Sequence, residues 1–210
     1  STLEARQKLA MLDAVRSTLP QGMTLSVVRQ PKALGLGHAV LCAYPIVGDK
    51  PFAVMLPDDL IDDLDGGCLA DMVALYNKKG AYSLAVEEVP RDKTDKYGVV
   101  SLNSDGQIVA MVEKPKPDLA PSTLAVVGRY VLPAETFQAL ATVQAGAGGE
   151  IQLTDGIASL LATQCFYPHR FKGTRYDCGS KLGYLQANVA FGLRDAEIGT
   201  NFQAWLHDNK

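Results

Sequence analysis

A nearly continuous apolar run, PFAVMLPDD at residues 51–59, constrains the fold most because it ends abruptly in two carboxylates. An uninterrupted apolar strand is typical of a parallel sheet that is covered on both faces. The polar end of such a strand lies at the carboxyl edge of the sheet, where open α/β sheets bind their ligands. The run therefore predicts an α/β fold with Asp58 and Asp59 at a candidate binding edge.

Helix-like and strand-like patterns alternate along the first half of the chain. Strands are expected at 24–30, 51–59 and 81–89, and helices at 3–19, 38–44 and 69–79, with Pro20 and Gly80 as helix ends. Because each helix can cross over from one strand to the next, this order favours a mixed, mostly parallel central sheet flanked by helices.

After Pro90 the pattern changes to short strands joined by polar turns such as NSDGQ, which indicates a small antiparallel part. Helices are expected at 134–142, 151–163, 180–194 and 200–208. No internal repeat, low-complexity tract or linker divides the sequence. We therefore expect a single domain, residues 1–210, that ends in a helical segment at about 180–210.

Composition excludes several classes of function. The 20 basic and 23 acidic side chains leave a formal charge of −3, without the clustered basic excess that nucleic-acid binding requires. No apolar run reaches the roughly 20 residues of a transmembrane helix, and no secretory leader opens the chain. We expect a soluble cytoplasmic protein that binds neither nucleic acid nor membrane.

The cysteines give little sign of metal chemistry. Cys42, Cys68, Cys165 and Cys178 are widely spaced, and so are the three histidines, which argues against a zinc site. Free cysteines of this kind are among the most buried side chains in proteins. We expect all four to be buried small hydrophobes in a reducing compartment.

The segment RQPKALGLGHA, residues 29–39, closes a predicted strand and opens a predicted helix. Gly35 and Gly37 permit close backbone approach to a ligand, and the free N–H groups of a helix start favour an anion or a polar base edge. The pattern G-x-G-x-x-G is not completed, because Val40 replaces its third glycine. A flexible connector that leaves Gln30 exposed explains the segment equally well.

Two strand ends carry carboxylates that could share a metal. Asp58 ends the run at 51–59, and Asp177 in YDCG precedes a predicted helix. Magnesium is held by one or two carboxylates together with substrate phosphates, so this pair is sufficient for a magnesium site. Turn formation at Asp58 and helix capping at Asp177 are the structural alternatives.

A third strand end carries the motif MVEKPK, residues 111–116. Lys114 is a compact cation suited to a phosphate, and Glu113 can accept hydrogen bonds from sugar hydroxyls. Adjacent glutamate and lysine are also common as a solvated surface pair with no further role.

Together these stretches resemble the bacterial UTP–glucose-1-phosphate uridylyltransferases, also called UDP-glucose pyrophosphorylases. The similarity covers nearly the whole chain, through VRQ…GLGHAVLCA, PFAVMLPDD, YGVV, VEKPK, PSTLAVVGRYVL, GGEIQLTD, DCGSKLGY and NFQAWL. The resemblance implies a Rossmann-like nucleotidyltransferase fold. It also implies transfer of UMP from UTP to glucose 1-phosphate, giving UDP-glucose and pyrophosphate, with Mg²⁺ as cofactor.

The resemblance implies a role for each matching position. Asp58 and Asp177 match the carboxylates that hold Mg²⁺, and Lys114 matches the lysine that engages the sugar phosphate. Lys114 and Asp58 are thus the implied catalytic residues. The other implied contacts are Gln30 and Gly35 to the nucleotide base, and Gly98, Glu113, Lys114 and Gly128 to the sugar phosphate.

Three further acidic residues receive no ligand role. Asp59 adjoins the metal position without matching a ligand, and Glu150 and Asp155 belong to a GGEIQLTD stretch that we expect to be structural.

The chain also departs from this family. The glycine-rich G-x-G-T-R-x-x-P loop and the K-x-x-P-K element that cradle the triphosphate have no counterpart, and the GTR at 173–175 is followed by YDCG instead. We therefore expect the 210 residues to lack an N-terminal part of the family fold, to be catalytically deficient alone and to be prone to associate.

Three alternatives remain open from the sequence. A related pyrophosphorylase could use another sugar or base, and a non-catalytic UDP-glucose-binding fragment would carry many of the same motifs. A dehydrogenase is disfavoured, because no third glycine and no suitable acidic residue complete its fingerprint.

The apolar residues Phe202, Trp205 and Leu206 could build a dimer or tetramer, or could fold back on the core of their own chain.

Overall fold

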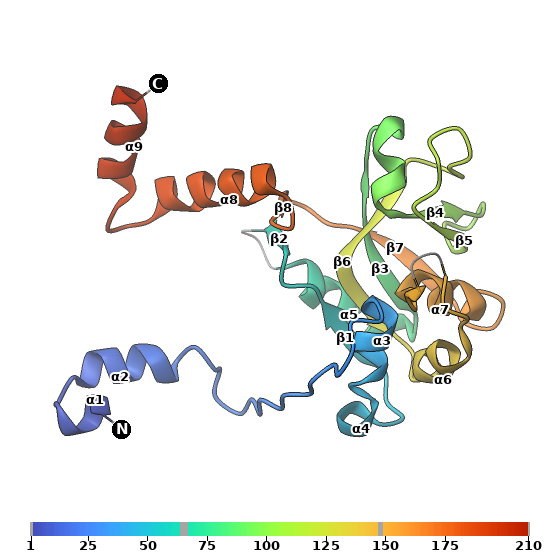
Figure 1. The fold of residues 1–210 in the computed structure, drawn as a ribbon, viewed down its shortest axis with the longest axis horizontal. Coiled ribbons are helices and arrows are strands. Elements are labelled where there is room, and N and C mark those ends of the chain that lie inside the picture. The colour runs from blue at the N-terminus through green and yellow to red at the C-terminus, as the bar shows by residue number, and fades with distance from the viewer. Residues whose placement is uncertain (1, 64–66, 147–148, 210) are drawn as a thin grey trace.

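The computed structural model describes residues 2–63, 67–146 and 149–209 and has a six-stranded sheet at its centre (Figure 1). The strands of this sheet are β1 (Phe52–Met55), β3 (Tyr82–Glu88), β4 (Gly98–Leu102), β5 (Ile108–Glu113), β6 (Leu124–Leu132) and β7 (Phe166–Arg170). The order is β5, β4, β6, β3, β7. Strand β3 pairs with β6 along one edge of β6. The other edge of β6 is shared by two strands, β4 near the start of β6 and β1 near its end.

The expectation of a mostly parallel sheet was wrong. Within the described residues, β3 and β7 form the single parallel pair, and β6 is antiparallel to β1, β3 and β4. The physical reason is the placement of β6. It lies between β1 and β3 and is antiparallel to both, so these two strands do not hydrogen-bond to each other.

Helices cover both faces of this sheet, as the alternation of patterns predicted. On one face, α5 (Cys68–Lys79) packs with Ala85, Val127 and Val131. On the other face, Leu84 and Val86 pack against the apolar sides of α3 (Leu36–Leu41), α6 (Glu135–Thr142) and α7 (Leu153–Leu160). Successive residues of β3 therefore serve opposite layers, which is the period of a central strand.

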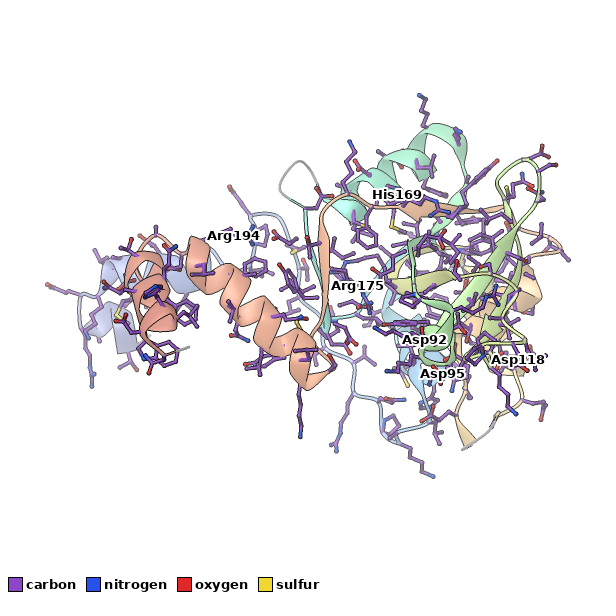
Figure 2. The ribbon with its side chains drawn as sticks, turned by 90° about the horizontal axis from the view of Figure 1, so that it is seen from above. Asp92, Asp95, Asp118, His169, Arg175 and Arg194 are labelled. Atoms are coloured by element: carbon purple, nitrogen blue, oxygen red, sulfur yellow. The ribbon has the colours of Figure 1, made fainter. Side chains whose placement is uncertain are left out.

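A two-stranded antiparallel sheet, made of β2 (Asp59–Asp62) and β8 (Thr174–Asp177), stands beside the central sheet. It leads into α8 (Lys181–Arg194) and α9 (Gly199–Asp208), which project away from the sheet (Figure 1). Arg194, labelled in Figure 2, lies 2.7 Å from a carboxylate oxygen of Asp62 and so ties α8 back to β2.

The predicted strand at 24–30 was wrong. These residues are irregular, and Leu25 and Val27 are 73% and 86% exposed. A β-branched sequence favours a strand only where it packs on a pleated surface, and no described strand pairs with this segment.

Several helix boundaries also differ from expectation. The helix expected at 3–19 is two shorter ones, α1 (Thr2–Ala5) and α2 (Leu9–Arg16), because Gln7 between them has a φ of +53°. The helical stretch expected at 38–44 is α3 followed by α4 (Tyr44–Val47), which has a proline in its first turn. By contrast, α5 ends at Gly80 as predicted, with this glycine in the left-handed conformation.

The strand predicted at 51–59 is shorter and less buried than expected. Residues 52–55 form β1, and inward residues alternate with the exposed Ala53 and Met55. This alternation is typical of a strand with one solvated face rather than two covered ones. None of the helices in the described ranges has the length and apolar character needed to cross a bilayer.

Candidate active site

A cavity of about 250 Å³ opens where β1 and β4 leave the shared edge of β6. The ladder between β3 and β6 shifts register here, between Leu84 and Val86, so the backbone around Gly128 departs from regular pairing. The cavity is lined by five of the residues expected in the site, namely Asp58, Gly98, Glu113, Gly128 and Asp177.

The carboxylates of Asp58 and Asp177 lie close together near Gly179, where β2 begins and β8 ends. A Cβ added to Gly179 would lie 3.1 Å from Asp58 Oδ2 and 3.2 Å from Asp177 Oδ1. The backbone fixes the pair, because the N–H of Cys178 donates to the carbonyl of Asp58 at 2.7 Å and that of Gly179 donates to Asp177 Oδ1 at 3.1 Å. The two carboxylates thus face a common space beside Gly179, which a side chain at that position would narrow.

This donor set fits a hard divalent cation that takes its remaining ligands from a substrate. In the part of the chain that the structure describes, no group of three or more histidine, cysteine, aspartate or glutamate side chains is placed to hold a metal. A complete protein cage for zinc or calcium is therefore not formed there. Two converging carboxylates are instead the arrangement that magnesium uses together with phosphate oxygens.

Glycine is required at two positions of the cavity wall. A Cβ on Gly98 would lie 2.6 Å from Thr154 Cγ2, and one on Gly128 would lie 2.7 Å from both Asp59 Oδ2 and Leu56 Cβ. Neither strand has space for a side chain, so both positions present bare backbone beside the cavity. The side chains of Thr154, Asp59 and Leu56 fill the space that a Cβ would need, so glycine is a packing requirement at both positions.

Glu113 is held in the cavity by a residue of α7. Thr154 donates its hydroxyl to Glu113 Oε2 at 2.8 Å, and Glu113 pairs with Gly98 in the β4–β5 ladder. The second oxygen, Oε1, lies 3.6 Å from Lys114 Nζ. Thr154 therefore orients one carboxylate oxygen of Glu113, and the other oxygen lies near the ammonium group of Lys114.

Lys114 lies next to the cavity but does not line it. Its side chain is 55% exposed, and its φ of +46° is in the left-handed region that non-glycine residues seldom adopt. The N–H of Lys114 donates to the carbonyl of Tyr97 at 2.9 Å, which holds this turn. The ammonium group is thus carried on a hydrogen-bonded backbone turn, and its side chain is exposed to solvent beside the cavity.

Gln30 and Gly35 also lie outside the cavity lining, although the next residue, Leu36, belongs to it. The amide of Gln30 donates to the carbonyl of Gly35 at 3.1 Å, and its Nε2 lies 2.9 Å from His38 Nδ1. Gly35 has a φ of +95°, and a Cβ there would lie 2.8 Å from the carbonyl of Ile151. Gln30 and Gly35 therefore form one local unit at the start of α3.

Residues 149–155, the described part of the GGEIQLTD stretch, hold this glycine loop, which fits the structural role expected for the stretch. The N–H of Ile151 donates to the carbonyl of Leu34 at 2.8 Å, and the N–H of Gly37 donates back to Ile151 at 2.9 Å. Glu150 is exposed and accepts from the side chain of Gln152 at 2.9 Å, and Asp155 is exposed on α7.

Sequence reasoning missed Arg175, which lines the cavity. Its side chain is 9% exposed, donates from Nε to Asp59 Oδ1 at 2.5 Å, and contacts Glu87 Oε1 at 2.6 Å. The guanidinium also lies 5.3 Å from the centre of the Tyr97 ring. Burial lowers the pKa of Arg175, but Asp59, Tyr97 and Glu87 outweigh it and raise the pKa overall.

A signal for this residue was present in the sequence. Arg175 stands two positions before Asp177, so on a strand the two side chains share one face. The tripeptide GTR at 173–175 does not continue as the phosphate loop of the family. Its arginine nevertheless has the two-residue spacing to Asp177 that is typical of one strand face.

The cysteines correct another expectation. Cys68 is buried, and burial raises the pKa of its thiol to about 11, whereas Cys165 is exposed. Cys42 and Cys178 are partly buried, and all four are free thiols. The expectation of four buried cysteines therefore holds fully for Cys68 alone.

Comparison with known proteins identifies the family. A family model described as nucleotidyl transferase matches residues 3–192. The UTP–glucose-1-phosphate uridylyltransferase of Escherichia coli K12 is 48% identical over 98% of this chain and 71% of its own length. The chain belongs to the nucleotidyl transferase family. It is a homologue of the bacterial UTP–glucose-1-phosphate uridylyltransferases, as the motifs predicted.

Solved structures of this nucleotidyl transferase family agree in fold. The UTP-bound enzyme of Acinetobacter baumannii superimposes with a TM-score of 0.86 at 40% identity, over 100% of this chain and 74% of that one. A UDP-glucose pyrophosphorylase complexed with UDP-glucose gives 0.76 at 40% identity, over 81% of this chain and 66% of that one. The expected α/β nucleotidyltransferase fold is confirmed, with the correction to strand direction described above.

Proposed function

We propose that this protein transfers UMP from UTP to glucose 1-phosphate, giving UDP-glucose and pyrophosphate. One observation carries the proposal: a single cavity brings together Asp58, Asp177, Gly98, Glu113 and Gly128, which lie far apart in the sequence. The similarity to uridylyltransferases over 98% of the chain supports the choice of substrates.

The metal end of the cavity is formed by Asp58 and Asp177. Their converging oxygens would hold Mg²⁺, which supplies positive charge to the phosphates of both substrates when bound. Because magnesium takes further oxygens from the nucleotide, two protein carboxylates are sufficient. Without a cation, these carboxylates would repel the substrates they face.

The sugar end of the cavity is formed by Gly98, Glu113 and Gly128. Glu113, oriented by Thr154, accepts hydrogen bonds from sugar hydroxyls, and Gly98 and Gly128 line the cavity beside it. Lys114 reaches the phosphate of the sugar with its ammonium group.

The nucleotide base contacts the start of α3. Gln30 and Gly35 offer amide and backbone groups to the edge of the uracil, beside Leu36 in the cavity wall. The Gln30 side chain must then exchange its bond to the Gly35 carbonyl for bonds to the base.

The reaction is a single displacement. A phosphate oxygen of glucose 1-phosphate attacks the α-phosphorus of UTP, and the bond from that phosphorus to pyrophosphate breaks. The electron pair leaves with pyrophosphate, so no covalent enzyme intermediate forms. The protein contributes by aligning two polyanions and offsetting their repulsion, with Lys114 as a cation that contacts the sugar phosphate.

Calorimetric titration of the purified 210-residue chain with UDP-glucose, dTDP-glucose and UDP-galactose in magnesium buffer tests this proposal. We expect UDP-glucose to bind most tightly, because both the base and the sugar are recognised. Tighter binding of another sugar nucleotide, or no binding at all, would contradict the proposal. Release of pyrophosphate from UTP and glucose 1-phosphate then distinguishes an enzyme from a binding fragment.

A further inference from the structure

The buried cation Arg175 connects four elements around the cavity. It lies on β8 and contacts Asp59 on β2, Glu87 on β3 and the ring of Tyr97, which follows the short 3-10 helix η1 (Arg91–Lys96). Figure 2 labels Arg175 where the arm formed by α8 joins the body of the molecule. A buried guanidinium with two carboxylate partners is a fixed group, because its planar fork defines where each partner sits.

Asp59 connects Arg175 to the backbone of Gly128 in the cavity wall. Its Oδ1 accepts from Arg175, and its Oδ2 accepts from the N–H of Gly128 at 2.7 Å. The residue is 8% exposed, so both of its oxygens are committed to the protein. Asp59 is therefore unsuited to a metal, although it is adjacent to the exposed Asp58.

The same pair fixes the register of the β2–β8 sheet. Asp59 stands opposite Asp177 and Ile61 stands opposite Arg175, so Arg175 reaches diagonally across the ladder to Asp59 on one face. A slip of one residue would turn Asp59 to the other face and would separate Asp58 from Asp177. Among the residues that the structure describes, this sheet has two strands, so side-chain contacts must supply much of the register specification.

We propose that Arg175 is a positioning residue: by clamping Asp59 against the N–H of Gly128, it fixes β2 on β8 and thereby holds Asp58 and Asp177 together for a divalent cation. The inference rests on the proposed function for its consequence in metal binding. Its geometric part, the clamp itself, is independent of any ligand.

Hydrogen exchange of backbone amides, measured by NMR without metal or nucleotide, tests the clamp. Arg175→Lys keeps the charge but cannot reproduce the forked contacts. We expect the amides of Gly128 and Cys178 to exchange about tenfold faster in this variant, while amides of α5 keep their protection. Unchanged exchange at Gly128 and Cys178 would overturn the clamp, and so would equal acceleration at α5, which would indicate general destabilisation.

Titration with MgCl₂ at fixed UDP-glucose, followed by the increase in unfolding temperature, tests the consequence. Groups that orient metal ligands typically change metal affinity by about 10- to 100-fold when altered, so the half-saturating Mg²⁺ concentration should rise by at least tenfold in Arg175→Lys. Asp59→Asn, which keeps the shape of the side chain, should give a similar rise. A variant with wild-type magnesium dependence would refute the positioning role.

The matched control is Arg170→Gln on β7, which removes an arginine that pairs with Glu88 but is 55% exposed. It should leave both amide exchange and magnesium dependence unchanged, because an exposed pair contributes little.

Failure of the proposed function and failure of the positioning role give different results. A wild-type chain that does not bind UDP-glucose refutes the proposed function, whereas normal binding with unchanged Arg175 and Asp59 variants refutes only the positioning role.

Discussion

In the proposed site, some residues would contact the substrate and others hold those residues in place, and adjacent residues can differ in this respect. Asp58 is exposed and Asp59 is 8% exposed, with both Asp59 oxygens bonded to protein. Glu113 and Thr154 divide the work in the same way, since the hydroxyl of Thr154 fixes one oxygen of the glutamate. Sequence motifs identify which residues belong to the site. Their burial and hydrogen bonds indicate which of them are free to bind a ligand and which hold other residues in place.

Thr154→Val should weaken recognition of the sugar. The substitution keeps the shape of the buried side chain and removes the hydroxyl that orients Glu113. Because a Glu113 side chain that is not held must be ordered when the sugar binds, at a cost of about 0.5–1.5 kcal/mol, we expect UDP-glucose to bind about two- to tenfold more weakly. Titration calorimetry measures the effect, with UDP as the control ligand. Equal weakening for UDP would mean that Thr154 acts on the cavity as a whole.

His169 should make the protein less stable in mild acid. Burial lowers the pKa of His169, Asp71 and Asp63 oppose this only in part, and Nε2 has no hydrogen-bond partner among the described residues. The unfolded chain therefore takes up a proton near pH 6.5 that the folded chain resists, and the free energy of unfolding falls as pH drops through that value. Urea unfolding at pH 7.5 and 5.5 should show this loss in the wild type and a smaller one in His169→Gln. An equal loss in both proteins would exclude His169 as the cause.

At the scale of elements, capping joins the site to the C-terminal helices. Ser180 follows the Asp177 turn and accepts the N–H of Gly183 at 3.0 Å, which starts α8. The hydroxyl also donates to the carbonyl of Asp177 at 2.9 Å. The helix start and the carboxylate are therefore parts of one turn.

Ser180→Ala should cost about 1 kcal/mol of stability, the usual contribution of a helix N-cap. Urea unfolding monitored by circular dichroism measures the change. Ser159→Ala is the matched control, because Ser159 lies inside α7, where alanine favours the helix more than serine does. If both substitutions have the same effect, Ser180 does not act as a cap.

Elements with strong local signals could be predicted from the sequence. The strand at β3 and the helix α5 with its Gly80 end follow from residue pattern alone. The antiparallel part after Pro90 was predicted, and β6 is antiparallel to β4. The position of β6 between β1 and β3 could not be predicted, because it depends on pairing between segments far apart in the sequence. The segment at 24–30 was misjudged because propensity describes a packed strand, and the segment has no described strand beside it.

The site could be predicted in part. Strand ends identified Asp58, Glu113 and Asp177, which the structure brings to one cavity. Thr154 acts through a contact to Glu113, far away in the sequence, and such a contact leaves no local pattern. Arg175 shares a strand face with Asp177, but its partner Asp59 is equally distant in the sequence.

At the scale of the whole molecule, apolar side chains on the C-terminal arm are exposed. Leu182, Leu185 and Trp205 on α8 and α9 are 67%, 61% and 58% exposed, and these helices project from the sheet (Figure 1). Such exposure commonly marks a surface that another molecule covers. This supports the expectation of a homo-oligomer.

We therefore expect the mass measured by light scattering to rise from that of a monomer towards that of a dimer or larger oligomer as concentration increases. Leu185→Gln combined with Trp205→Gln should reduce this association, because both changes remove apolar surface without touching the cavity. A wild-type chain that stays monomeric at every concentration would contradict the expectation.

The central claim is that Asp58 and Asp177 jointly hold a divalent cation against the substrate phosphates. Calorimetric titration with UDP-glucose, in magnesium and in EDTA, tests it most directly when wild type is compared with Asp58→Asn, Asp177→Asn and the exposed control Asp155→Asn. We predict that EDTA weakens binding to wild type and to the control by about tenfold or more, and that both site variants bind in magnesium as wild type does in EDTA. Site variants that keep the full magnesium effect would contradict the account.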